Sequence, residues 1–194
     1  DADLMWRNQE TGANRYWEMD GLMRLSSLAV RSVHLDWKVA GSGDFDGDGR
    51  NDLFWRHSTT GANVIWLMES EEIATRGQLT AVPIAWEVSG IGDFDADGMD
   101  DIFWNYPTTG ANSIWLLYGA ERKSRHSVPR SSVGWRAFGV LDMNGDSLAD
   151  ILLRHNVYGW NRLWLMNGST RTHNLEVRTV SDPDWEPVAV GNTP

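Results

Sequence analysis

The segment Asp44-Phe45-Asp46-Gly47-Asp48-Gly49-Arg50-Asn51-Asp52 places four carboxylates within nine residues. It returns 49 positions later at 93–101 and, with Asn144 replacing one aspartate, 49 positions later again at 142–150. Tryptophan follows nearly the same period, in two columns made of Trp17, Trp66, Trp115 and Trp164 and of Trp37, Trp86, Trp135 and Trp185. A period this regular indicates a duplicated structural unit.

Each unit reads as four short strands joined by turns. The acidic loop is followed by the apolar run 53–56, a turn at 58–61 and a second apolar run at 64–68. Aromatic and β-branched runs bounded by Gly, Thr and Asn predict strands and hairpins. The Gly-rich segment 37–43 is expected to be an inner strand that leads into the acidic loop. A polar stretch follows the second run in every unit and is expected to be an outer strand, at 22–33, 72–82, 121–133 and 171–180.

These units predict an all-β fold, because no helical periodicity is sustained anywhere in the chain. Four strands per roughly 49 residues, two of them apolar on both faces, are typical of a β-propeller blade. We therefore expect residues 1–194 to form a single β-propeller domain of four four-stranded blades. The segment 185–191 aligns with a first strand, so it would close the ring by pairing with the N-terminal unit. A fragment of a larger propeller, or two chains paired into eight blades, remain alternatives.

Composition excludes several classes of protein. The chain has no cysteine, which removes disulfides, thiolate zinc sites and cysteine nucleophiles. Its 27 acidic and 17 basic residues give a formal charge of −10, which disfavours nucleic acid as a partner. No apolar run approaches the roughly 18 residues of a membrane span, and no signal peptide is evident. Because the chain opens with Asp1 rather than Met, we expect it to be processed or cut.

Each acidic loop is a candidate site for one hard cation. Carboxylates at positions 1, 3, 5 and 9 and the carbonyl at position 7 can converge, and oxygen-only ligation favours Ca²⁺ over Mg²⁺. The expected ligands are Asp44, Asp46, Asp48, the Arg50 carbonyl and Asp52; Asp93, Asp95, Asp97, the Met99 carbonyl and Asp101; and Asp142, Asn144, Asp146, the Leu148 carbonyl and Asp150. We expect two to three structural Ca²⁺ ions in place of disulfides.

The third loop is expected to bind more weakly than the other two. Asn144 removes one charge, and Ser147 replaces the glycine that relieves the bend at position 6. The loop divided between the two termini keeps too few carboxylates to bind an ion. An EF-hand is excluded, because its twelfth position requires a glutamate and is here Trp55, Trp104 or Leu153. A solvated turn is the plain alternative, although four like charges in nine residues repel one another without a cation.

The unit resembles the FG-GAP or VCBS repeat of integrin-α-like propellers and many bacterial secreted proteins. The resemblance covers essentially the whole chain and is carried by Gly43–Gly49, Asp52–Arg56, Gly92–Asp95, Asp101–Trp104 and Ile65–Met68. It implies calcium between the first two strands of each blade. Because the family includes adhesion proteins, fungal lectins and modules of polysaccharide-degrading enzymes, it also implies recognition outside the cell. Such propellers usually have seven or eight blades, so closure at four stays open.

Repeated polar columns are the candidate ligand-binding residues. A third tryptophan column runs Trp6, Trp55 and Trp104 and ends at Leu153. The candidates are Arg7, Arg56 and Arg154, which directly follow this column; Asn14, Asn63, Asn112 and Asn161, which lie three residues before the column of Trp17; and Trp160, at a turn where other units have alanine. Sugars pack their C–H groups on indole while their hydroxyls need fixed polar partners. The structural alternative is that asparagine bonds neighbouring backbone and arginine spans blades.

No nucleophile elbow, phosphate loop, zinc motif or dinucleotide fingerprint is present, so we expect no enzyme activity. The sequence predicts a secreted, calcium-binding, non-catalytic β-propeller that recognises carbohydrate at repeated inter-blade sites. Its partners would be glycans or a cell-surface glycoprotein, and it would act as a monomer or a homodimer. The alternatives are a protein-adhesion or assembly module like the integrin head, and an accessory domain of a polysaccharide-active enzyme.

Overall fold

A computed structural model describes residues 3–69, 72–182 and 184–187 of the chain. Every regular element within these residues is a β-strand, and every strand pairing is antiparallel, which confirms the all-β prediction. No helix among the described residues is long and apolar enough to cross a bilayer.

Three units each form a four-stranded sheet whose strands are neighbours in chain order. This meander follows from the short turns between runs of apolar residues, which favour hairpins. The three sheets comprise β6 (Trp37–Gly43), β7 (Asp52–His57), β8 (Asn63–Glu69) and β9 (Glu72–Leu79); β10 (Glu87–Gly92), β11 (Asp101–Tyr106), β12 (Ala111–Tyr118) and β13 (Glu121–Val128); and β14 (Trp135–Leu141), β15 (Asp150–His155), β16 (Asn161–Asn167) and β17 (Thr170–Val177).

The N-terminal unit is different. Its sheet has three strands, β1 (Leu4–Arg7), β2 (Asn14–Trp17) and β5 (Leu28–Val30), and a separate hairpin pairs β3 (Met19–Asp20) with β4 (Met23–Arg24). The expected outer strand at 22–33 is therefore wrong in extent, because the hairpin takes up its first part. The proposed closing strand at 185–191 falls largely on residues 188–191, which lie outside the described part of the chain. Within the described part, no strand pairing joins the first sheet to the last.

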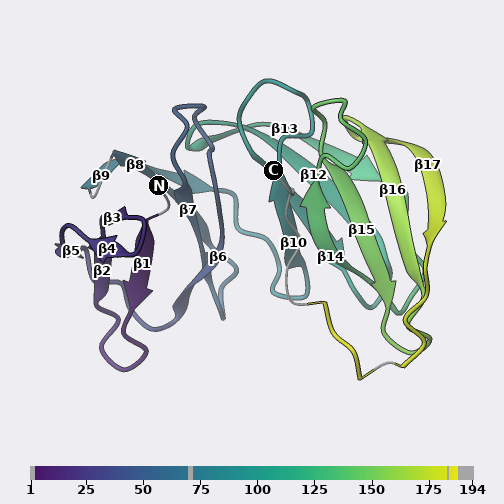
Figure 1. The fold of residues 1–194 in the computed structure, drawn as a ribbon, viewed down its shortest axis with the longest axis horizontal. Helices are drawn as coiled ribbons and strands as arrows, with labels where there is room; N and C mark the ends of the chain where they lie inside the picture. The colour runs from purple at the N-terminus through teal and green to yellow at the C-terminus, as the bar shows by residue number, and fades with distance from the viewer. Residues whose placement is uncertain (1–2, 70–71, 183, 188–194) are drawn as a thin grey trace.

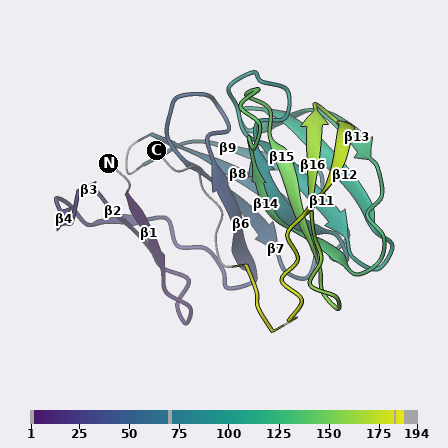
Figure 2. The same cartoon turned by 45° about the vertical axis from the view of Figure 1, so that its right-hand side comes forward.

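The sheets follow one another in chain order, with the N-terminal sheet at the left end in both views (Figures 1 and 2). Each pair of neighbouring sheets encloses its own hydrophobic core. Val30 of the first sheet packs with Trp55 of the second, Phe54 of the second with Trp104 of the third, and Phe103 of the third with Leu153 of the fourth. Burial on both faces explains why β7, β8, β11 and β12 are nearly continuous apolar runs.

The inner strands β6, β10 and β14 approach one another closely. A Cβ added at Gly90 of β10 would lie 2.1 Å from Cγ2 of Val140 on β14, and one added at Gly41 of β6 would lie 2.3 Å from Cδ1 of Ile91. Glycine is therefore required here for close approach between sheets. The inner strands end at the acidic loops, so their packing sets where those loops lie.

Candidate metal centres

Each acidic loop joins the first and second strands of a four-stranded sheet and turns around its first aspartate. In the 44–52 loop, Oδ1 of Asp44 accepts hydrogen bonds from the N–H groups of Gly47 (2.7 Å) and Asp48 (3.1 Å), and Oδ2 accepts one from Gly49 (2.7 Å). Gly49 has a φ of +85°, a conformation that glycine adopts without strain. At the same position of the third loop, Ser147 has a φ of +68°.

The ninth aspartate of each loop joins the loop to the third strand of its sheet. Asp52 is fully buried, and its two oxygens accept hydrogen bonds from the N–H groups of Phe45 (2.9 Å) and Met68 (2.8 Å). Asp101 and Asp150 make the same pair of bonds, to Phe94 and Leu117 and to Met143 and Met166. The spacing of the aspartates predicts these residues only as metal ligands; their hydrogen bonds to the third strand depend on strand pairing, which the motif does not report.

The buried ninth aspartates have raised pKa values. Burial raises the pKa of Asp52 to about 6 and that of Asp101 to about 7, because the low-dielectric surroundings disfavour the ionised carboxylate. The N–H groups of Phe94 and Leu117 oppose this shift at Asp101, whereas the charges of Asp95 and Asp93 add to it.

The structure brings part of each predicted ligand set together in two loops. Carboxylate oxygens of Asp44, Asp46 and Asp48 lie within 4.8 Å of one another, and so do those of Asp93, Asp95 and Asp101. Burial raises the pKa of the Asp46 carboxyl group, and the charges of Asp48 and Asp44 add to this shift. The N–H groups of Arg50, Met99 and Leu148 donate within their loops to Asp48, Asp97 and Asp146. Ligation through the carbonyls of these three residues stays a prediction.

The third loop is arranged differently. The side-chain amide of Asn144 donates to Oδ2 of Asp146 at 3.0 Å, and Asp142 accepts four bonds from backbone N–H groups. Among the described residues, no group of three acidic side chains converges in this loop. The amide of Asn144 thus satisfies a carboxylate that a cation would otherwise bridge, while the backbone bonds to Asp142 repeat those to Asp44.

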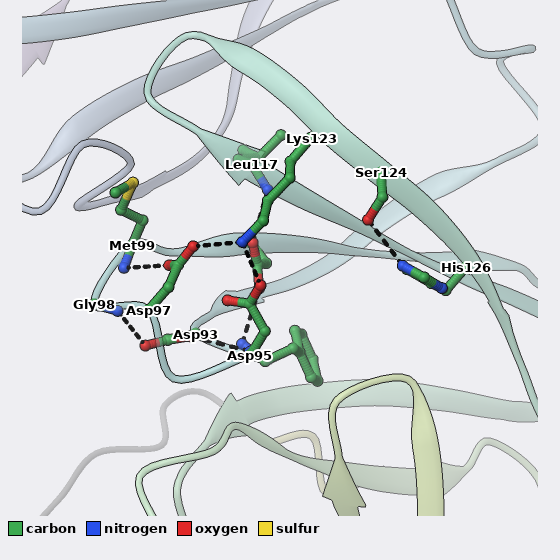
Figure 3. Close-up of polar contacts among 11 residues, drawn as sticks. Asp93, Asp95, Asp97, Gly98, Met99, Leu117, Lys123, Ser124 and His126 are labelled. Carbon is green, nitrogen blue, oxygen red and sulfur yellow. Dashed lines mark hydrogen bonds and ion pairs between the residues drawn. The ribbon is translucent and has the colours of Figure 1, made fainter.

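The first two loops fit a hard divalent cation by the chemistry of their donors, which are all oxygens. In the second loop, Oδ1 of Asp95 is buried and accepts no hydrogen bond within the described structure. A buried carboxylate oxygen without a donor is unfavourable unless a cation or water approaches it. A side-chain cation does approach the other oxygen of this residue: Lys123 of β13 reaches the loop, as Figure 3 shows.

In three of the four units, the repeated arginine binds the connection that follows the outer strand. Nη1 of Arg56 donates to the Gly61 carbonyl (3.2 Å) and to Oδ1 of Asn63 (3.0 Å), and Nη2 donates to three further carbonyls, of Val82, Pro83 and Trp86. Arg7 and Arg154 make equivalent bonds. The guanidinium N–H groups therefore donate to acceptors within the same chain. This favours the interpretation that the arginines hold the fold together and do not bind a ligand.

The asparagine column binds the backbone in the same region, just after the outer strand. The amide groups of Asn14, Asn63, Asn112 and Asn161 each donate to the backbone carbonyl that lies 17 residues further along the chain. Ligand binding by the arginine and asparagine columns remains a prediction that these internal contacts do not favour.

One aromatic cluster is exposed and belongs to the fourth unit alone. Tyr158 and Trp160 stack with ring centroids 4.5 Å apart and an interplanar angle of 25°, and about half of each side chain is exposed. The other units carry threonine and alanine at these two positions. Trp160 also borders a surface hollow of about 390 Å³ that is lined by Asn161, Arg162, Glu176, Val177 and Thr179.

Comparison with protein families matches residues 44–104 and 93–153 to a repeat described as FG-GAP-like. The two matches overlap and together cover more than half of the chain. Each match begins at the first residue of one acidic loop and contains the whole of the following loop. No curated protein matches the chain.

In calcium-free buffer with chelator, we expect the free energy of unfolding to rise as the pH falls from about 8 to about 5. The folded-state pKa values of Asp52 and Asp101, about 6 and about 7, exceed the ordinary value of 3.8. The folded chain therefore binds more protons in this range, and ionisation destabilises it as the pH rises through these values.

Urea unfolding followed by tryptophan fluorescence at several pH values measures this dependence. The variant Asp101→Asn removes the group with the higher pKa and is expected to flatten the profile above about pH 6. A wild-type stability that falls steadily on acidification over this range would contradict the prediction.

Proposed function

Because this chain belongs to the FG-GAP-like repeat family, we propose that it is a secreted, calcium-binding recognition module without catalytic activity, and that its ligand is carbohydrate. The observation that carries the recognition is the exposed pair Tyr158 and Trp160 beside a polar hollow. The acidic loops carry the calcium part, and the extracellular location follows from the resemblance to secreted repeat proteins.

In this proposal calcium would stabilise the fold by joining the carboxylates of one acidic loop. Asp44, Asp46 and Asp48 would hold one ion and Asp93, Asp95 and Asp101 another, because their carboxylate oxygens converge. The ion would neutralise like charges that the loop backbone only partly compensates. With no cysteine in the chain, divalent ions are the available substitute for disulfides between the strands.

Calcium is expected to bind the full chain and raise its melting temperature. At a hundredfold excess over Kd, one site stabilises a protein by about 2.7 kcal/mol, which corresponds to about 5–10 °C for a chain of this size. Calorimetric titration and thermal unfolding with and without chelator measure both effects. Asp46→Asn should abolish binding at the first loop, whereas Asp20→Asn, an exposed aspartate outside the loops, should change nothing. Absence of any calcium response would refute the calcium part.

Carbohydrate suits the Trp160 site because the two chemistries that a sugar ring needs lie side by side. An exposed indole face packs against ring C–H groups, while Arg162, Glu176 and Thr179 border the same hollow and can bond hydroxyls. Arg162 lies 3.9 Å from Glu176, and both side chains are partly exposed to solvent. We therefore place recognition at this one hairpin in preference to the repeated columns, whose donors are engaged internally.

A glycan array read with and without chelator tests the recognition. We expect binding to a defined set of sugars, and Trp160→Ala should weaken it about tenfold, the effect of losing one aromatic contact of about 1.4 kcal/mol. Tyr118→Ala provides the matched control, since Tyr118 is exposed but lies on a different sheet. An array without signal in either condition would overturn the carbohydrate assignment.

A protein-adhesion module is the second candidate, and one observation favours it. The hairpin of β3 and β4, absent from the other units, exposes Leu22, Met23 and Leu25. Exposed apolar residues that cluster in this way are typical of protein-binding surfaces. Substituting the three by serine would distinguish the candidates, since glycan binding should persist while protein adhesion should be lost.

We also propose that the four sheets close into a β-propeller ring. The support is an arginine–tryptophan contact between successive sheets: Arg7 lies over Trp55 (5.0 Å) and Arg56 over Trp104 (4.9 Å). In the third sheet Asn105 replaces the arginine, and Leu153 replaces the tryptophan that would follow it.

The fourth sheet has the arginine, and the first sheet has an exposed tryptophan. Arg154 makes no cation–π contact within the described residues, and Trp6 is 50% exposed, whereas Trp55 and Trp104 are 1% exposed. Closure of a four-bladed ring would place Arg154 over Trp6, in the way that Arg56 lies over Trp104. In a dimer of eight blades, the same contact would join two chains.

The ring predicts energetic coupling between Arg154 and Trp6. A double-mutant cycle with Arg154→Asn and Trp6→Leu should give an interaction energy of about 0.5–2 kcal/mol in urea unfolding. The two substitutes are the residues that the third sheet and the fourth sheet carry at the equivalent positions. The cycle of Arg7 with Trp55 serves as the positive control. Additive effects at Arg154 and Trp6 would contradict closure, and the molar mass in solution separates four blades from eight.

A further inference from the structure

In each four-stranded sheet, the outer strand contains a β-bulge. In the second sheet Leu67 pairs with Thr75 and Met68 with Ile73, so that Ala74 has no partner. The same shift leaves Lys123 unpaired in β13 and Thr172 unpaired in β17. These three residues are 49 positions apart and thus occupy one structural position. A bulge redirects the side chain of its extra residue.

In the third sheet, the bulge directs Lys123 onto the acidic loop of the same unit. Its Nζ lies 2.9 Å from Oδ2 of Asp95 and 3.0 Å from Oδ2 of Asp97, so one ammonium bridges the third and fifth loop positions (Figure 3). A lysine ammonium is a compact point charge with three donors. It therefore supplies to this loop the positive charge that a metal ion would supply.

The other two loops have no such partner at the bulge. Ala74 carries no charge, and the hydroxyl of Thr172 donates to the Leu165 carbonyl at 3.0 Å. In the 44–52 loop, the closest cation within the described structure is Arg50, whose Nη1 lies 3.8 Å from Asp48 in an exposed position. Two loops that share aspartates at positions 1, 3, 5 and 9 thus differ in whether the chain itself provides a bridging cation.

We propose that Lys123 is a built-in cation of the 93–101 loop, which it holds together without metal and from which it must be displaced before a divalent ion can bind. A tethered competitor lowers the apparent affinity by the fraction of time for which it vacates the site. The 44–52 loop is then the tighter and more metal-dependent site. This inference rests on the proposed function only in taking calcium as the competing ion.

Chemical labelling tests the contact without any metal. The chain has two lysines, Lys38 and Lys123, and both are exposed, so accessibility alone does not separate them. In metal-free buffer, we expect an amine-acylating reagent to modify Lys123 several-fold more slowly than Lys38, as read by peptide mass spectrometry. Calcium should accelerate the labelling of Lys123 and leave that of Lys38 unchanged. Equal metal-free rates would overturn the proposal.

Calcium titration of the full chain tests the competition with two reciprocal variants. Lys123→Met keeps the apolar stem and removes the charge, and it should raise the calcium affinity of the 93–101 loop about tenfold. Ala74→Lys introduces the charge at the equivalent bulge and should lower the affinity of the 44–52 loop by a similar factor. Lys38→Met is the control and should leave both affinities unchanged.

The outcomes separate the two proposals. If no variant binds calcium, the calcium part of the proposed function fails, and the metal-free labelling rates alone decide whether Lys123 holds the loop. If the wild type binds calcium and neither Lys123→Met nor Ala74→Lys changes an affinity, the competition is wrong although calcium binding stands. Thermal unfolding in chelator confirms folding of each variant and should show a lower melting temperature for Lys123→Met alone.

Discussion

The concentration of negative charge at the acidic loops is the constraint on which the rest of the structure depends. Each loop must turn the chain between the two innermost strands of a sheet, and the turn is made by winding backbone N–H groups around its first aspartate. The ninth aspartate then ties this turn to the third strand from a buried position. Both contacts require carboxylates, and the repulsion that accumulates must be neutralised locally.

The three loops meet this constraint in different ways, although their sequences share one pattern. In the 93–101 loop an ammonium from the neighbouring bulge bridges two carboxylates, while in the 142–150 loop Asn144 replaces a charge and donates to Asp146. The 44–52 loop has neither device, and burial, with the charges of Asp48 and Asp44 in addition, raises the pKa of Asp46. A shared motif therefore does not imply equal dependence on a metal ion, because the neutralising group comes from outside the motif.

The sequence predicted the strands, the meander and the acidic turns, because a regular period and alternation of turn residues report local structure directly. It did not predict the contact of Lys123, since a bulge in strand pairing decides which residue of a polar strand faces the loop. The sequence did not predict the hydrogen bond from the Met68 N–H to Asp52 for a similar reason, because Met68 comes close to Asp52 only once β7 and β8 have paired. The hairpin of β3 and β4 takes up the first part of a predicted outer strand and leaves only β5 of it, because no repeated pattern marks the hairpin.

The repeated polar residues of this chain bind its own backbone, and the positions proposed for other roles are those that differ between units. The repeated arginine and asparagine columns, which looked like binding sites, are used to hold outer strands and to join one sheet to the next. Positions that this framework leaves free are those where the units diverge: Trp160 stands where the others have alanine, and Lys123 where they have alanine, threonine or leucine. Because packing between sheets does not constrain a turn tip or a bulge, a substitution there can add chemistry without disturbing the fold. In this chain we therefore expect contacts with ligands other than calcium at departures from the period, whereas the repeated acidic loops are the candidate metal sites.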